Sequence, residues 1–166
     1  IQQLVDKLLV QARLESRPEM ETAPIAIAAL IDQTVACKEA QATQRGVRLR
    51  LEALVEVTLN GDALLISQAL TNLLDNAIRH TPPGGDIGVR LWRQDDRVMV
   101  QVSDSGPGIP QTLRADLFVR PSVLSGARRP SGGLGLMIVR RILQLHDSDI
   151  QLIEQAQSGA CFRFAI

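Results

Sequence analysis

Aromatic residues are almost absent from this chain of 166 residues: they make up 2% of it, and there is no Tyr. A hydrophobic core must therefore be built from Leu, Ile, Val and Ala, and a hydrophobic content of 45% is enough for one domain. No apolar run approaches the ~18 residues that a membrane-spanning helix needs. No signal peptide and no initiator Met are visible, and the sequence pattern starts in the middle of a helix, so we expect a fragment of a longer protein.

Neither sign of charge dominates, because 18 basic residues balance 18 acidic ones. No basic excess therefore favours a nucleic acid as a partner. The two cysteines, Cys37 and Cys161, are far apart and lack the spacing of metal ligands. They predict reduced, packed thiols in a cytosolic setting.

The first part of the chain predicts two segments that precede the main domain. Residues 1–15 carry an apolar stripe at helical spacing, which either packs on the domain's own core or forms the end of a helical hairpin that dimerises. Because the stripe continues to the first residue, we favour the hairpin and assign residues 1–17 to it. Residues 18–24 are polar, contain two prolines and predict a linker. Residues 25–166 form the main domain.

The main domain mixes helices with strands. Helical spacing predicts helices over 25–45, 63–81 and 132–146, and alternation predicts strands over 47–52, 54–59, 87–93, 98–102, 150–153 and 160–165. Asn60 and Gly61 predict a turn before the second helix. Since most connections are hairpins, we expect an α/β (α+β) two-layer sandwich, with three helices on one face of a mixed, mostly antiparallel sheet.

The helix over 63–81 is the most informative element. Asp62 can cap it, and the proline pair 82–83 ends it. Asn72 and Asn76 are one turn apart on its polar face, and Arg79 continues that face. Two stacked asparagines fit either a solvated surface or a site for a metal and phosphate, because amide oxygens are hard ligands suited to Mg²⁺.

A second motif follows the strand over 98–102. Residues 104–109 read Asp-Ser-Gly-Pro-Gly-Ile. The Asp104 carboxylate can accept a hydrogen bond from an exocyclic amine, as adenine has, and Gly106 and Gly108 let the backbone approach a flat ligand. A plain turn is the alternative, since Asp and Gly are common turn residues.

A third motif opens the last helix. Gly133 and Gly135 lie at its start, where free N–H groups predict a phosphate cradle. An ordinary helix N-terminus after a loop gives the same pattern. It is not a P-loop, because no Gly-Lys-Ser/Thr follows, and not a dinucleotide fingerprint, because residues 119–131 before it predict a loop.

Taken together, the motifs resemble the ATP-binding catalytic domain of bacterial sensor histidine kinases, which has the Bergerat, or GHKL, fold. Residues 72–81 resemble the N box, 104–109 the G1 box and 133–136 the G2 box, in the same order and spacing. Leu117 and Phe118 resemble a reduced F box. The resemblance covers about residues 22–166, and residues 1–16 resemble the end of the second helix of that family's dimerisation hairpin.

The resemblance implies ATP and Mg²⁺ as cofactors. Asn76 would bind Mg²⁺ with the assistance of Asn72, Arg79 would contact phosphate, and Asp104 would bind the adenine amine. Residues 119–131 would be the ATP lid. The remaining nucleotide contacts implied are His80, Gly106, Gly108, Ile109, Arg120, Gly133, Leu134, Gly135 and Leu136.

The resemblance also implies an activity and partners. The γ-phosphoryl group of ATP would pass to a histidine on a dimerisation domain and then to a response regulator. The whole protein would be a homodimer at the bacterial inner membrane, with this chain on the cytoplasmic side. The only histidines here, His80 and His146, lack the setting of the acceptor, so this chain alone should not autophosphorylate.

Two further departures concern the lid. The second Phe of the F box is missing, and Ser131 takes a place often held by glycine. A non-catalytic pseudo-kinase that binds partners is therefore one alternative, which binding of Mg·ATP would distinguish.

Other classes of the same fold are further alternatives. ATPases of the gyrase, MutL and Hsp90 types carry Glu at the place of Asn72, where the carboxylate activates water. Asn cannot act as a base, which argues against these types. A serine kinase of the anti-sigma type stays an alternative, although the helix over residues 1–16 fits it poorly.

Overall fold

This computed structural model describes residues 20–118, 134–155 and 158–166. A five-stranded sheet has the order β2-β4-β5-β7-β6. β2 (Arg48–Ala53) pairs in parallel with β4 (Asp86–Gln94). β4 pairs with β5 (Arg97–Asp104), β5 with β7 (Cys161–Ala165) and β7 with β6 (Ile150–Leu152), and these three pairs are antiparallel.

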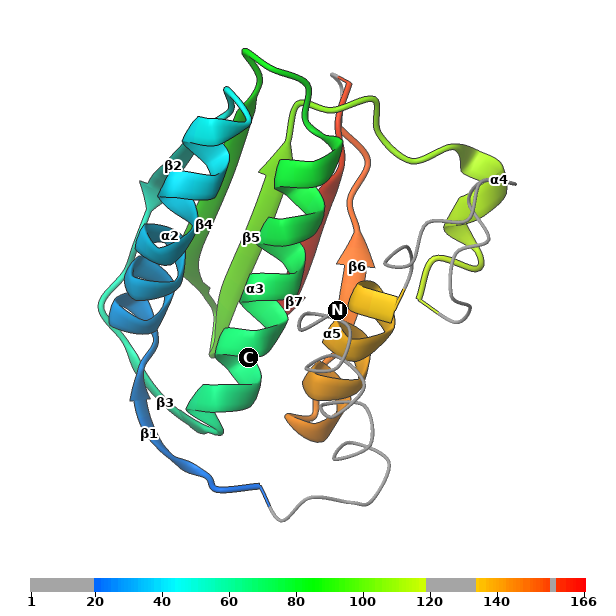
Figure 1. Ribbon diagram of the computed structural model, residues 1–166. Coiled ribbons are helices and arrows are strands. Elements are labelled where there is room, and N and C mark those ends of the chain that lie inside the picture. The colour runs from blue at the N-terminus through cyan, green and yellow to red at the C-terminus, as the bar shows by residue number, and fades with distance from the viewer. Residues whose placement is uncertain (1–19, 119–133, 156–157) are drawn as a thin grey trace.

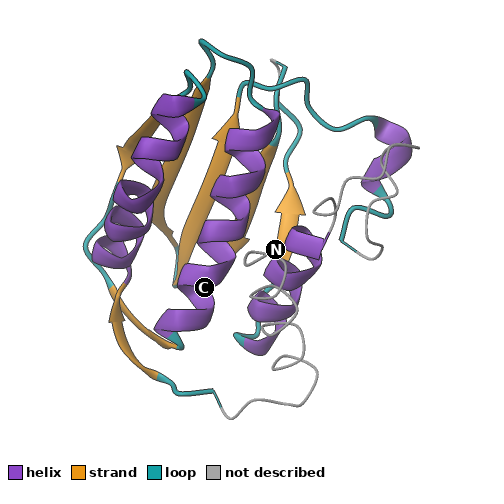
Figure 2. Ribbon diagram, viewed as in Figure 1, coloured by secondary structure: helices purple, strands orange, loops and turns teal. Residues whose placement is uncertain are grey.

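The helices cover one face of this sheet (Figures 1 and 2). They are α2 (Ile27–Gln44), α3 (Ala63–His80) and α5 (Leu134–Leu145), while the short α4 (Gln111–Arg114) lies to one side. The predicted two-layer sandwich is confirmed. None of the helices in the described residues is long and apolar enough to cross a membrane.

The central helix α3 lies between α2 and α5 and packs against both. Its N-cap is Asp62, whose Oδ1 accepts a hydrogen bond from Leu65 N–H at 3.1 Å, as the sequence predicts. Its apolar side is buried against the sheet, where each fully buried Leu or Ile side chain contributes ~1.5–3 kcal/mol. The buried apolar side chains are Ile66, Ala69, Leu70, Leu73, Leu74, Ala77 and Ile78.

The inner face of the sheet completes the core with alternate residues of three strands. The intervening residues face away from the helices. The buried residues are Ile87, Val89 and Leu91 on β4, Val98, Val100 and Val102 on β5, and Phe162 and Phe164 on β7.

Three local predictions are wrong. Residues 54–57, which the sequence places in a strand, lie in none, because the strand there begins only at Thr58. β1 (Ala23–Ala26) pairs with β3 (Thr58–Gly61) in a separate two-stranded antiparallel sheet. Ile25 therefore lies in a strand rather than a helix, and Asn60 and Gly61 lie in a strand rather than a turn. Pairing between distant segments takes precedence here over the local turn preference. β1 begins inside the predicted linker, and residues 1–19 lie outside the described residues, so the boundaries at 17 and 24 stay predictions.

The structure shows the surroundings of His146 and of the two cysteines. His146 Nδ1 lies 2.8 Å from Ile142 O, and its Nε2 accepts a hydrogen bond from Asp62 N–H at 3.0 Å. This ring therefore joins the end of α5 to the beginning of α3. Cys161 is buried, but Cys37 is exposed, so the prediction of a packed thiol is wrong for Cys37, which lies on the solvent side of α2.

Candidate functional site

Asn72 is the most unusual residue of α3. Its side chain is 3% exposed, although the sequence places it on the polar face of the helix. Both Oδ1 and Nδ2 are buried without a hydrogen-bond partner among the described residues. An unsatisfied buried polar group costs ~1–3 kcal/mol, so such a group in a folded protein calls for an explanation. A ligand that binds this amide would supply one.

The start of α5 lies against this amide. A Cβ added at Gly135 would be 3.8 Å from Asn72 Oδ1 and 3.9 Å from its Cβ and Cγ. Gly135 is the second residue of α5, and the first N–H groups of a helix have no partner within it. These N–H groups and the positive end of the helix dipole favour an anion beside Asn72.

The predicted N box continues along α3 from this point. Asn76 lies one turn further and is half-buried, Arg79 is half-buried in the last turn, and His80 at the end is exposed. The amide oxygen of Asn76 and the guanidinium cation of Arg79 therefore follow one another along the same helix. The side-chain amide oxygens of Asn72 and Asn76 are hard oxygen ligands of the kind that Mg²⁺ binds, so these side chains fit that metal.

Asp104 is the last residue of β5 and is 7% exposed. Its Oδ1 accepts hydrogen bonds from Gly106 N–H at 2.9 Å and from Ala160 N–H at 3.2 Å. Burial raises the pKa of this carboxyl, while the two backbone hydrogen bonds and the nearby His80 act in the opposite direction. With both bonds on Oδ1, the other oxygen can accept from a ligand amine.

The glycines after Asp104 permit close backbone contacts. A Cβ at Gly106 would be 2.8 Å from both Asp104 Oδ1 and His80 O. Gly108 has a φ of +77°, and a Cβ there would be 2.9 Å from Gly159 O. Both positions therefore require glycine. The turn lies against the end of α3, which brings the predicted N and G1 boxes together.

Three residues of this site are absent from the sequence predictions. Ser158 Oγ donates to Gly106 O at 2.8 Å, Gly159 packs on the Asp104 carbonyl with a φ of +131°, and Ala160 donates to the Asp104 carboxylate. The sequence Ser-Gly-Ala signals only a turn, because nothing local connects it with Asp104. These residues hold the predicted G1 turn from the opposite side.

The remaining predicted site residues differ in how deeply they are buried, and some lie outside the described residues. Leu136 is buried and packs in the core, and Ile109 and Leu134 are partly buried against it. Arg120 and Gly133 lie outside the described residues, as does the predicted lid. Their roles stay predictions.

The part of the F box that is described is well anchored. Leu117 is 5% exposed, and the ring of Phe118 packs edge-on against Phe162, with centroids 6.1 Å apart and an angle of 76° between the planes. The chain is therefore held to β7 just before the predicted lid.

Comparisons with known proteins agree with this geometry. The family model described as histidine kinase-, DNA gyrase B- and HSP90-like ATPase matches residues 61–166. The circadian input-output histidine kinase CikA of Synechococcus elongatus is 30% identical over 96% of this chain and 22% of its own length. The sensor protein CreC of Escherichia coli is 34% identical over 96% of this chain and 34% of its own length. The chain thus spans about a fifth to a third of the relatives' length.

Solved structures show the same similarity. Full-length ShkA in complex with AMPPNP has a TM-score of 0.82 and 27% identity, over 98% of this chain and 35% of that one. The nucleotide-free catalytic domain of the histidine kinase ThkA has a TM-score of 0.78 and 28% identity, over 89% of this chain and 95% of that one.

Proposed function

Because this chain belongs to the histidine kinase-, DNA gyrase B- and HSP90-like ATPase family, we propose that it binds Mg·ATP and acts as the catalytic domain of a sensor histidine kinase. The observation that carries the proposal is the buried amide of Asn72 beside Gly135 at the start of α5, which has no hydrogen-bond partner within residues 20–118, 134–155 and 158–166. A triphosphate with its metal would satisfy both the amide and the free N–H groups of α5.

The phosphate end of the site is assigned to α3 and α5. Asn76 would hold Mg²⁺ with the assistance of Asn72, and Arg79 would contact phosphate. When bound, the metal would neutralise charge on the transferred phosphoryl group. Asn72 also separates this site from an ATPase of the gyrase type, since an amide cannot activate water as a base.

The adenine end is assigned to the turn after β5. The Asp104 carboxylate would accept from the adenine amine, which favours adenine over guanine because guanine has a carbonyl at that place. Gly106, Gly108 and Ile109 would lie along the base. The other assigned contacts are His80, Arg120, Gly133, Leu134, Gly135 and Leu136.

The acceptor and the partners belong to the whole protein. The γ-phosphoryl group would go to a histidine of a dimerisation domain and then to a response regulator, in a homodimer. The relatives named as sensor proteins and histidine kinases support this assignment. The inner membrane and residues 1–17 as the end of the dimerisation hairpin belong to the same proposal.

A calorimetric titration tests nucleotide binding. The chain is titrated with AMPPNP and with the matching GTP analogue, each with and without Mg²⁺. We expect saturable binding that prefers adenine and is strengthened by Mg²⁺. Absence of binding at millimolar nucleotide would overturn the proposal in favour of a non-catalytic module.

Phosphoryl transfer is tested with the phospho-accepting hairpin of a related kinase supplied as substrate. Asn76→Ala should abolish Mg²⁺-dependent transfer while the unfolding temperature stays unchanged. Asn60→Ala makes the same chemical change on β3, remote from the site, and should transfer normally. Retained transfer by the Asn76 variant would remove the metal assignment.

A further inference from the structure

The imidazole of His146 is a link between two helices that uses both of its ring nitrogens. Nε2 accepts a hydrogen bond from Asp62 N–H at 3.0 Å, so the proton of the ring is on Nδ1, which donates to Ile142 O at 2.8 Å. Because a rotation of the ring in either direction would break one of these bonds, its orientation is fixed. Nε2 is therefore a defined point of contact between the end of α5 and the beginning of α3.

Gly61, the last residue of β3, leaves the space that this ring occupies. A Cβ added at Gly61 would be 3.2 Å from His146 Cδ2, 3.3 Å from its Nε2 and 3.0 Å from Ile66 Cδ1. At these distances the ring would have to move by a few tenths of an ångström. Glycine at this position therefore lets the ring come close enough to accept from Asp62 N–H.

The beginning of α3, where the ring binds, is itself held in place. Asp62 Oδ1 caps the helix by accepting from Leu65 N–H, and Asp62 Oδ2 accepts from Glu21 N–H at 3.3 Å. The residue before it, Gly61, pairs with Ala23 of β1. Since this end of α3 is fixed by its cap and by the β1–β3 sheet, the hydrogen bond to His146 places α5 relative to a fixed end of α3.

The same two helices meet again at the candidate nucleotide site. α5 runs antiparallel to the first half of α3 (Figure 1), so Gly135 near its beginning lies against Asn72 in the middle of α3. Along either helix, this contact is ~15 to 16 Å from the hydrogen bond between His146 and Asp62, at a rise of ~1.5 Å per residue. A shift of α5 along α3 would take Gly135 away from the amide, and the bond at the far end opposes such a shift.

We propose that His146 is a positioning residue for nucleotide binding, because its hydrogen bond with Asp62 fixes α5 along α3 and so keeps Gly135 against the Asn72 amide. This role rests on the proposed function, which assigns the phosphates to Asn72 and the start of α5. His146 lies at the end of α3 that is opposite to Arg79, so it acts through the placement of α5 and not by contact with phosphate.

Two substitutions at His146 separate its acceptor from its packing. His146→Gln places an amide oxygen near the position of Nε2 that can accept from Asp62 N–H, whereas His146→Phe keeps a ring and has no acceptor. In calorimetric titration with AMPPNP and Mg²⁺, we expect the His146→Phe variant to bind about tenfold more weakly and the His146→Gln variant to stay within about threefold of the wild type. Each titration is made at a temperature at which thermal unfolding shows the variant to be folded.

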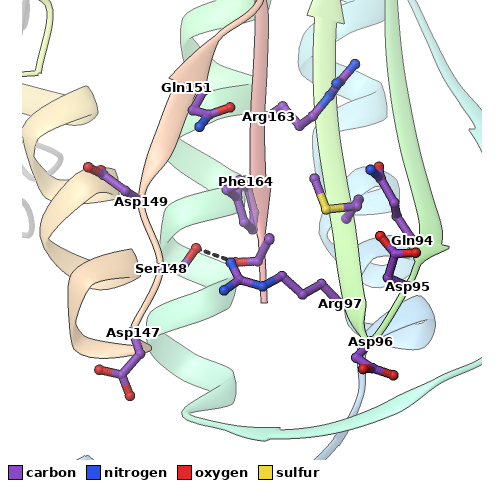
Figure 3. A pocket seen from close by; sticks show the side chains of 12 residues that line it. Gln94, Asp95, Asp96, Arg97, Asp147, Ser148, Asp149, Gln151, Arg163 and Phe164 are labelled. Atoms are coloured by element: carbon purple, nitrogen blue, oxygen red, sulfur yellow. Dashed lines mark hydrogen bonds between the residues drawn. The ribbon is translucent and has the colours of Figure 1, made fainter.

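Ser148→Ala is the matched control, because Ser148 follows α5 closely but holds this end of the helix to the sheet. Its Oγ donates to Ala165 O, at the end of β7 (Figure 3). The variant loses a hydrogen bond beside His146 and should bind AMPPNP like the wild type. The proposal is overturned if Ser148→Ala and His146→Phe weaken binding equally, if His146→Gln is as weak as His146→Phe, or if His146→Phe leaves the affinity unchanged.

A second readout does not depend on nucleotide. In the isotope-labelled chain without ligand, the NMR signals of the Gly135 N–H and the Asn72 side-chain amide should shift in His146→Phe and return toward their wild-type positions in His146→Gln. Gly61→Ala, which displaces the ring from the side of β3, should shift them as well. Unshifted signals in His146→Phe would overturn the positioning role. If the wild type fails to bind AMPPNP, the proposed function fails, and these signals alone decide whether His146 places α5.

Discussion

Gly135 of α5 faces the Asn72 amide on α3 so closely that a methyl group added at Gly135 would be in van der Waals contact with it, 3.8 Å from Asn72 Oδ1. Two motifs that are far apart in the sequence therefore form one surface. The amide has no partner among the described residues, and the glycine keeps the space beside it free of a side chain.

Gly135→Ala should separate stability from nucleotide binding. The added methyl group makes only ordinary contacts, and Ala favours a helix over Gly by ~0.5–1 kcal/mol, so the unfolding temperature should stay the same or rise. The same methyl group occupies the space that we assign to phosphate, so the affinity for AMPPNP should fall about tenfold or more. Thermal unfolding and calorimetric titration measure the two effects. An unchanged affinity would remove Gly135 from the site.

Asn72→Leu should have a similar but stronger effect. Leu has a comparable volume and no polar atoms, so the variant removes a buried amide that is unsatisfied in the described part of the chain, at a cost of ~1–3 kcal/mol. We therefore expect the free energy of unfolding to stay the same or increase, while nucleotide binding in the presence of Mg²⁺ is lost. Urea unfolding and calorimetry test this expectation. A loss of several kcal/mol in stability would instead show that Asn72 has a structural partner.

The sequence predicted best where a single element carries its own periodicity. The helix α3, with its Asp62 cap, and the alternating strands β4 and β5 were predicted within a few residues, because their buried faces repeat locally. β1 was missed because a strand of four residues is defined by its pairing with β3, not by its own pattern.

The residues of the candidate site were likewise predictable only where one short stretch of sequence carries them. Asp104 and Gly106 could be recognised from one short motif, but Ser158, Gly159 and Ala160 could not, since only the fold brings β7 to the end of β5. The burial of Asn72 was also missed. A helical projection places it among polar residues, and it does not show that α5 packs onto α3 beside this side chain.

Asp104→Asn should weaken ATP binding more than it weakens folding. The amide oxygen of Asn can still accept from Gly106 and Ala160 N–H, whereas its NH₂ group would face the adenine amine with a donor in place of an acceptor. We expect a small change in unfolding temperature and an affinity for AMPPNP reduced about tenfold or more. Asp95→Asn, in the β4–β5 turn, is the matched control and should bind normally. Equal losses of stability and affinity would mark Asp104 as structural.

The raised pKa of Asp104 gives a pH dependence with a defined sign. Burial raises this pKa above the unfolded value of ~3.9, so the folded chain holds the proton more tightly than the unfolded one. The contribution of Asp104 to the free energy of unfolding is therefore fully present below the unfolded pKa and is lost as the pH rises through the folded pKa. Because the Asp104→Asn variant does not titrate there, the stability of the wild type relative to this variant should fall over that window and level off above the folded pKa.

Nucleotide affinity should change in the opposite direction over the same window, because only the ionised carboxylate presents two acceptor oxygens to Gly106, Ala160 and an adenine amine. Urea unfolding at a series of pH values gives the first slope, and calorimetric titration with AMPPNP gives the second. A relative stability that rises with pH would mean that the backbone hydrogen bonds to Oδ1 outweigh the burial of the carboxylate. An affinity that does not change with pH would mean that Asp104 does not contact the base, even if its pKa is raised.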